Sequence, residues 1–196
     1  MWKRGLEAVV NLVFYSLIAV LLFGALRHYV AQPFQVDGHS MEATLLDQEH
    51  LFLLPKASIE RFDVVVFPDP RGHGDSYIKR VIGLPGDRLR VENDQLYLND
   101  QAVAEPYLEP MKSQSTQKPF TQDFSLWDTI GQETVPEGYY FVMGDNRPRS
   151  GDSRQFGLVP IDSVKGEANF VYLPFNRMRQ LPHYQLNADG SVTVKP

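Results

Sequence analysis

Residues 77–87 read YIKRVIGLPGD, and the first six, Tyr77–Ile82, are β-branched, aromatic or long side chains that run into a Gly/Pro turn signal. Such runs are typical of β-strands. Similar runs occur at Phe34–Val36, His50–Leu54, Asp63–Phe67, Arg88–Val91, Gln95–Leu98, Tyr139–Met143 and Ala168–Leu173. No amphipathic helical segment of comparable strength lies among them. The sequence therefore predicts a mainly β protein with an antiparallel sheet.

Turn-rich and polar segments divide this β region. We expect a main β domain at 31–92 and 138–175, an inserted, smaller β subdomain at 93–137, and a C-terminal tail at 176–196. Glu92–Asn93–Asp94 is typical of a hairpin loop, and the polar stretch Met111 to Asp123 of an exposed loop. The Asp189–Gly190 pair between two short apolar runs predicts a hairpin in the tail.

The amino-terminal residues 1–30 have a different character. Ala8 to Leu26 carry no charge, and as a helix they would extend about 28 Å, close to the thickness of a bilayer core. A cleaved signal peptide would have a shorter apolar region and a small-residue cleavage site, whereas Arg27 follows directly here. Lys3 and Arg4 on the amino-terminal side favour an inside amino terminus. The sequence predicts a transmembrane anchor with the β domain on the far side of the membrane.

Composition excludes several classes of protein. The 196-residue chain has 24 acidic against 19 basic residues, a formal charge of −5, which argues against a nucleic-acid-binding surface. It contains no cysteine, which excludes a disulfide framework, a thiol nucleophile and a cysteine zinc site. With 43% hydrophobic residues the chain can bury a core.

The candidate chemistry lies in four segments: VDGHSMEATL at 36–45, RFDVVVF at 61–67, YIKRVIGLPGD at 77–87 and GDNRPRSGDSR at 144–154. Each segment alone has a structural explanation. A serine in a glycine-containing turn often bonds to the backbone, and a lysine between apolar neighbours usually extends its amine to water from an edge strand. The last segment alone would be a turn with a surface ion pair.

In this order, however, the four segments resemble the type I signal peptidase family (leader peptidases, peptidase S26), membrane-anchored serine proteases that remove signal peptides from exported proteins. The family's Ser-Met-x-Pro-Thr-Leu box is similar to Ser40–Leu45, and its Arg-x-Asp-Val-Val-x-Phe box to Arg61–Phe67. Its lysine box matches Tyr77–Asp87 almost letter for letter. Its last box, Gly-Asp-Asn with Ser-x-Asp-Ser-Arg and Gly-x-Val, matches Gly144–Val159. The resemblance extends from the anchor to about residue 172.

The resemblance implies a role for each matching residue. Ser40 would be the nucleophile and Lys79 the general base of a Ser/Lys dyad. Ser150 would hold the lysine amine, and Asp152 and Arg154 would support the site as an ion pair.

The resemblance also implies a substrate. Signal peptides would be cut after small residues, in sites of the Ala-x-Ala type, while bound in an extended form along Phe34, Val36, Leu45, Tyr77 and Ile78. The backbone N–H of Ser40 would stabilise the oxyanion. Gly38 stands where some members have a serine that supplies a second donor, so the second donor stays unassigned. Ala43 stands where the family has proline, which removes a fixed φ angle but no reacting group.

The implied mechanism has a clear physical requirement. Serine is a weak nucleophile unless a base accepts its proton, and lysine can do so only when neutral. Near pH 7.5 only about one unperturbed lysine in a thousand is neutral. Burial among apolar neighbours shifts the pKa in the required direction. The reaction that the resemblance implies would proceed through an acyl-enzyme and would need no metal or other cofactor.

Other classes remain as alternatives. A histidine-based serine hydrolase would use one of five histidines, but His39 is a poor base for Ser40, because adjacent side chains in an extended segment point apart. Lysine at position 79 favours the bacterial or organellar branch over the endoplasmic-reticulum branch, which has histidine there. The remaining alternative is a catalytically inactive, membrane-tethered β module that binds exported chains. The expected location is a bacterial plasma membrane or a thylakoid, and the expected partners are signal peptides and the bilayer.

Overall fold

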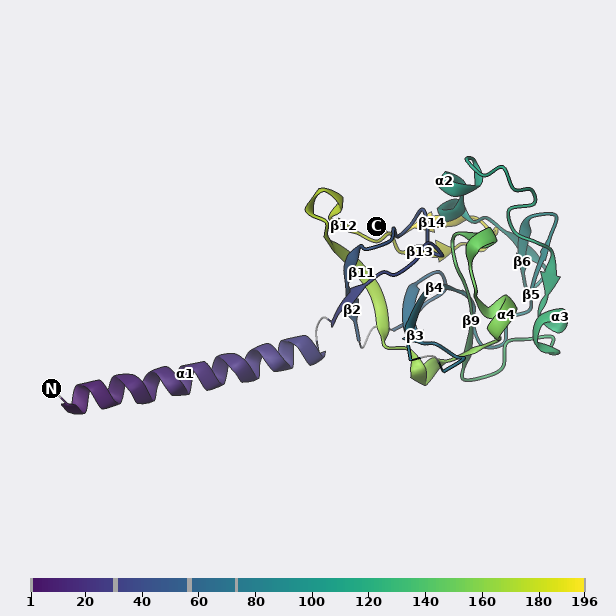
Figure 1. Cartoon of the computed structure of the whole chain (residues 1–196). Coiled ribbons are helices and arrows are strands. Elements are labelled where there is room, and N and C mark those ends of the chain that lie inside the picture. The colour runs from purple at the N-terminus through teal and green to yellow at the C-terminus, as the bar shows by residue number, and fades with distance from the viewer. Residues whose placement is uncertain (1, 30–31, 56–57, 73, 196) are drawn as a thin grey trace.

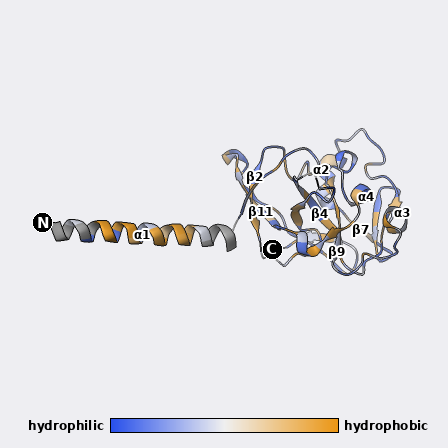
Figure 2. Cartoon of the chain, turned by 60° about the horizontal axis from the view of Figure 1, so that its bottom comes forward, coloured by the Kyte–Doolittle hydropathy of each residue, from blue (hydrophilic) through white to orange (hydrophobic). Residues whose placement is uncertain are grey.

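The structure is a computed structural model that describes residues 2–29, 32–55, 58–72 and 74–195. A long helix, α1 (Trp2–Tyr29), precedes a β-rich body (Figure 1). Its middle part is mostly hydrophobic (Figure 2), and its apolar side chains from Val9 to Phe23 are exposed. In the part of the chain that the structure describes, no helix reaches both the length and the hydropathy that crossing a membrane requires. The helix is thus present where an anchor was predicted, but a membrane span is not confirmed.

The larger sheet is antiparallel and has the order β1-β2-β11-β3-β4-β9-β10, with β12 paired to β11. Its strands are β1 (Gln32–Gln35), β2 (His50–Leu54), β3 (Val64–Pro68), β4 (Ser76–Gly83), β9 (Tyr139–Met143), β10 (Val159–Pro160), β11 (Gly166–Leu173) and β12 (Arg179–Gln180). The longer strands coincide with the predicted β runs. The short β10 and β12 were not predicted, because two residues give no pattern to detect.

The smaller sheet has the order β7-β6-β5-β8. Its strands are β5 (Leu89–Glu92), β6 (Gln95–Leu98), β7 (Gln101–Val103) and β8 (Phe124–Ser125). The predicted hairpin loop is confirmed, since Glu92 pairs with Gln95 across Asn93 and Asp94, which have φ values of 51° and 64°. Because β5 pairs with β6 and β8, the smaller sheet begins before residue 93, the boundary that the sequence predicted.

Short helical segments connect the strands. They are η1 (Pro106–Leu108), α2 (Glu109–Lys112), α3 (Leu126–Ile130), η2 (Arg147–Arg149), α4 (Ser153–Phe156), η3 (Ile161–Ser163) and η4 (Phe175–Arg177). In the tail, β13 (Tyr184–Leu186) pairs with β14 (Val192–Val194), which confirms the hairpin predicted at Asp189–Gly190. The Ala104 N–H donates to the Gly190 carbonyl at 3.1 Å, so this hairpin is attached next to the smaller sheet.

The cores lie on both faces of the larger sheet. Val64 and Val66 pack in one cluster, and Val65 and Phe67 pack in another, because successive side chains of a strand point to opposite faces of the sheet. A strand buried on both faces explains the continuous apolar run in RFDVVVF. A further cluster joins the larger sheet to the smaller one through Ile82, Leu89, Leu96 and Phe141, together with Tyr184 of the tail.

Candidate active site

Ser40 lies in a turn that follows β1, and its neighbours hold the turn against the sheet. Met41 and Leu45 are buried, with 1% and 0% exposure, and pack in the core on that face. The Asn146 N–H donates to the carbonyl of Ser40, and its side-chain amide donates to the carbonyl of His39, each at 3.0 Å. Anchoring on both sides fixes the turn, so Ser40 is presented by a rigid segment.

The amine of Lys79 donates to Ser40 Oγ at 2.7 Å and to the carbonyl of Ile78 at 2.8 Å. Lys79 is only 4% exposed. Burial lowers the pKa of Lys79 to about 8, although the charges of Asp152 and Asp145 act in the opposite direction. At pH 7 about a tenth of this amine is therefore uncharged and can accept a proton, compared with less than one in a thousand for an ordinary lysine.

The position of Lys79 on β4 explains why it lacks a strong counter-ion. The next residue, Arg80, points to the other face of the strand and is 1% exposed. Its guanidinium binds Asp145 in a bidentate manner, with Nε–Oδ1 at 2.9 Å and Nη2–Oδ2 at 2.6 Å. Among the described residues no carboxylate lies within ion-pair distance of the Lys79 amine. The carboxylate of Asp145 is thus paired with Arg80, and the hydrogen-bond partners of the Lys79 amine are a neutral hydroxyl and a neutral carbonyl.

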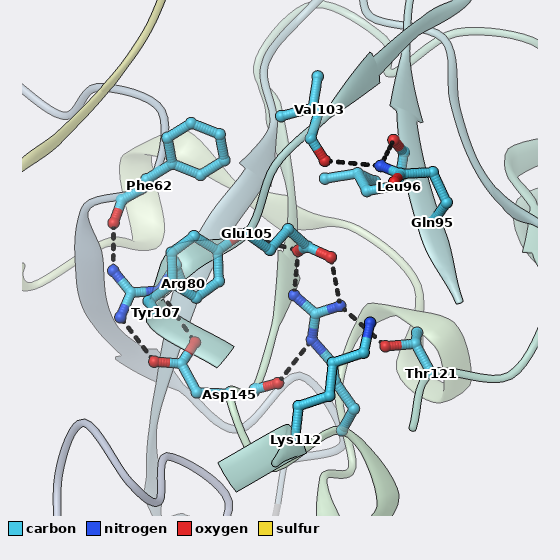
Figure 3. A network of polar contacts seen from close by, with 12 residues as sticks. Phe62, Arg80, Gln95, Leu96, Val103, Glu105, Tyr107, Lys112, Thr121 and Asp145 are labelled. Atoms are coloured by element: carbon cyan, nitrogen blue, oxygen red, sulfur yellow. Dashed lines mark hydrogen bonds and ion pairs between the residues drawn. The ribbon is translucent and has the colours of Figure 1, made fainter. Parts of the chain in front are cut away.

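The pair of Arg80 and Asp145 was not predicted as part of the site, although the Gly-Asp-Asn box that contains Asp145 was recognised. Figure 3 shows Arg80 between the carbonyl of Phe62 and the carboxylate of Asp145, with the Tyr107 ring against its guanidinium. The hydroxyl of Thr44, from the segment of Ser40, also donates to Asp145. This network connects the loop of Ser40 to β4 and β9.

Asp152 and Arg154 lie together, as the resemblance implied. Arg154 binds Asp152 through Nε–Oδ1 and Nη2–Oδ2, both at 2.8 Å, and Asp152 also accepts the Gly144 N–H at 3.0 Å. Burial opposes the ionisation of Asp152, but the ion pair with Arg154 outweighs it and the pKa of Asp152 is lowered. A charged Asp152 fixes the position of Gly144.

Ser150 does not make the expected bond to the lysine amine. Its Oγ is buried and makes no hydrogen bond of ordinary geometry among the described residues, although its contact with Asp152 helps to lower the pKa of that carboxylate. The Lys79 amine is directed instead at Ser40 Oγ and the Ile78 carbonyl. Ser150 Oγ instead lies against Gly144, where a Cβ would collide with both Ser150 Oγ and the carbonyl of Ser40. Only glycine fits at position 144.

A cavity of about 240 Å³ opens beside the dyad and is lined by Phe34, Tyr77 and Ile78 together with Ser40 and Lys79. The predicted groove residues Val36 and Leu45 do not line it. They are 1% and 0% exposed and pack in the core below. Val36 continues the pairing of β1, since its N–H donates to the carbonyl of Glu49 at 2.8 Å and its carbonyl accepts the N–H of Gln48 at 3.0 Å, and its side chain lies on the buried side.

Among the strands that the structure describes, none pairs with the second edge of β4 beside this cavity. Ser76 to Lys79 pair with β3 on one side, whereas β9 pairs only with the segment from Arg80 to Gly83. An extended peptide can add to such an edge through backbone hydrogen bonds.

A separate cluster joins the C-terminal tail to the larger sheet. The Nδ1 atom of His183 lies 3.0 Å from Glu167 and 3.6 Å from Asp63, and ligand atoms of the three residues lie within 4.8 Å of one another. Burial and the charge of Asp63 raise the pKa of Glu167 to about 7. None of these residues lines the cavity beside Ser40.

An antiparallel β fold that presents a serine hydroxyl to a buried, partly neutral amine defines the class of the protein, a candidate serine hydrolase with a lysine base. Comparison with known proteins agrees with this class. Residues 9–173 match the family described as signal peptidase, peptidase S26. The chain belongs to this family and is a hydrolase of the serine-peptidase class.

Individual relatives are similar over most of their length. Signal peptidase I of Bacillus amyloliquefaciens is 40% identical over 179 residues, covering 89% of this chain and 93% of the relative. Signal peptidase I S of Bacillus subtilis strain 168 is 42% identical over 168 residues, covering 83% of this chain and 88% of the relative. A crystal structure of a signal peptidase I from Enterococcus faecalis V583 is 46% identical with a TM-score of 0.54, and the match covers 57% of this chain and 97% of that one.

Proposed function

We propose that Ser40 and Lys79 are the catalytic dyad of a signal peptidase that removes signal peptides from exported preproteins. The observation that carries the proposal is the 2.7 Å bond from a buried lysine amine to the serine hydroxyl. At this distance a neutral amine can take the hydroxyl proton directly.

In the first step Ser40 Oγ attacks the scissile carbonyl while Lys79 accepts its proton. The proton passes to the leaving amine, and an acyl-enzyme forms on Ser40. Water then hydrolyses the ester, with Lys79 again as the base. The backbone N–H of Ser40, which has no acceptor among the described residues, is the proposed oxyanion donor. The roles of Asp152 and Arg154 are indirect, since they fix Gly144, which lies against Ser40.

The substrate is proposed to bind as an extended strand along the free edge of Ser76 to Lys79. Phe34, Tyr77 and Ile78 bound a small cavity of about 240 Å³, which suits alanine-sized side chains before the cleavage site. All these residues belong to the larger sheet and its loops, so we assign catalysis to that sheet and treat the smaller sheet as an inserted subdomain.

We also propose that α1 attaches the enzyme to a membrane, with the amino terminus in the cytoplasm and the catalytic sheet on the other side. The residues from Val9 to Gly24 carry no charge, and every described side chain among them is exposed to solvent. Such a surface is unfavourable in water. Because β1 begins at Gln32, the catalytic sheet would lie near the bilayer, either the bacterial plasma membrane or a thylakoid.

The alternative function is a catalytically inactive membrane module that binds exported chains, and the geometry of the dyad does not favour it. The test is cleavage of a purified preprotein with an Ala-x-Ala site, with the product sequenced from its new amino terminus. We expect the wild type to cut after the second alanine and Ser40→Ala to be inactive while still binding the preprotein. Binding without cleavage by the wild type would support the alternative.

A further inference from the structure

Arg149 lines two cavities. One is the 240 Å³ cavity that contains Ser40 and Lys79. The other measures about 400 Å³ and is also lined by Glu42 and Asn146. Asn146 donates to the carbonyl of Ser40 at 3.0 Å, and Glu42 lies two residues after Ser40, so the second cavity begins at the nucleophile's own loop.

A peptide that is cut at Ser40 must extend from the scissile bond in both directions. The first cavity and the free edge of β4 account for the residues before the bond. The second cavity is the neighbouring open space and is large enough for a few residues. Its lining includes Gln114–Gln117, which belong to the polar loop predicted at Met111 to Asp123. The amide and hydroxyl side chains of these residues suit a polar, hydrated segment of the substrate.

Two charged side chains line the second cavity, those of Glu42 and Arg149. The carboxylate of Glu42 is already engaged, by His39 Nδ1 at 2.8 Å and by the Asn146 amide at 3.5 Å. Arg149 is exposed, and in the described part of the chain no carboxylate pairs with its guanidinium. The cavity thus offers one free cation at the point where it meets the first cavity.

We propose that the second cavity receives the residues that follow the scissile bond and that Arg149 selects an acidic side chain among the first three of them. This inference rests on the proposed function, because it assigns the second half of the same substrate groove. Arg149 acts as a specificity-determining residue and takes no part in bond making.

The test uses the full chain in detergent and a set of preproteins with one signal peptide and one Ala-x-Ala site. Asp, Asn or Lys is placed in turn at the first, second and third positions after the cut, and kcat/KM is measured for each. Wild type should prefer Asp over Lys at one of these positions by about three-fold, as expected of an exposed ion pair. Arg149→Glu should reverse the preference, Arg149→Lys should retain it, and added salt should weaken it.

Arg71→Glu is the matched control, because Arg71 is another exposed arginine that lines the first cavity but not the second. Its Asp-to-Lys ratio should equal that of the wild type whatever happens to its rate. An unchanged ratio in Arg149→Glu, or an equal reversal in Arg71→Glu, overturns the inference while the proposed function stands. Failure of the wild type to cut any of the preproteins overturns both.

Discussion

Lys79 and Arg80 are consecutive residues of β4, yet their cationic groups lie in opposite electrostatic environments. One edge of the Arg80 guanidinium is bound by both carboxylate oxygens of Asp145, with the shorter contact at 2.6 Å. The Lys79 amine contacts a hydroxyl and a carbonyl. Because successive side chains of a strand point to opposite faces, Arg80 lies beside a carboxylate and stays charged, whereas Lys79 is buried without a close carboxylate and has a pKa of about 8. A structural cation and a candidate base can occupy adjacent positions because the strand separates their surroundings.

The pair of Arg80 and Asp145 should be important for stability. Asp145→Asn leaves a buried guanidinium without its counter-charge, which typically costs about 3–5 kcal/mol. We expect a large fall in the thermal unfolding midpoint together with loss of activity. Asp100→Asn is the control, because the Asp100 side chain is 64% exposed where it pairs with Arg88 and Arg90. Equal midpoints for the two variants would contradict the role of the buried pair.

Gly144 should tolerate no side chain. Gly144→Ala places a Cβ against Ser150 Oγ and the Ser40 carbonyl, so the loop of Ser40 must move. We expect kcat to fall by at least about ten-fold, since small displacements of reacting groups are costly. In Gly151→Ala the new Cβ meets only the flexible end of Gln155, at 3.4 Å, so kcat should fall far less than in Gly144→Ala even though Gly151 lines the 240 Å³ cavity. Comparable kcat values for the two variants would refute the close packing at Gly144.

Glu167 should make stability depend on pH. Burial and the charge of Asp63 raise its pKa to about 7 from an ordinary 4.5, although His183 and Lys195 act in the opposite direction. The folded state thus holds a proton that the unfolded state releases between about pH 4.5 and 7. This contribution to stability is complete below pH 4.5 and is lost as the pH rises to 7.

Unfolding midpoints at pH 5 and pH 8 test this sign. The fall in midpoint between the two should be larger for the wild type than for Glu167→Gln, which cannot ionise. Glu92→Gln is the control, because the Glu92 side chain is 55% exposed, and its fall should match that of the wild type. A fall in Glu167→Gln as large as in the wild type would show that other groups cause the pH dependence.

Helix α1 should hold the enzyme in a membrane. We expect the full chain to stay in the membrane pellet after alkaline carbonate extraction. Leu17, which is 58% exposed in the apolar part of the helix, is the place to test it, because Leu17→Arg adds a charge that lipid disfavours. This variant should be extracted more readily. Trp127→Arg alters an exposed apolar residue of the β-rich body and should have no effect. Complete extraction of the wild type would rule out integration of α1.

The sequence was a good guide wherever the decisive information was local. The β-branched runs gave the longer strands, and Asn93–Asp94 gave a hairpin. The similar pair Asn99–Asp100, with φ values of 51° and 68°, makes the next turn and could have revealed β7 in the same way. The strand β5 was also predicted, at Arg88–Val91, but its membership of the smaller sheet was not, because its pairing with β8 joins segments far apart in the chain.

Parts of the site could not be predicted because they depend on side-chain direction and on distant contacts. Val36 and Leu45 belong to the nucleophile segment, but both side chains are buried in the core. The bond between Arg80 and Asp145 joins residues 65 positions apart, and no local pattern indicates it. The predicted bond between Ser150 and Lys79 is absent because the Lys79 amine is directed at Ser40 Oγ and the Ile78 carbonyl, and the sequence does not indicate that direction.

The central claim is that Lys79 is the base for Ser40, and the pH dependence of kcat/KM for preprotein cleavage tests it most directly. Between pH 6 and 10 the rate should rise with a midpoint near pH 8, the pKa of the buried amine in the free enzyme. Lys79→Ala should show no cleavage at any pH. A midpoint near 6.5, the usual value for histidine, or cleavage that survives Lys79→Ala would contradict the account.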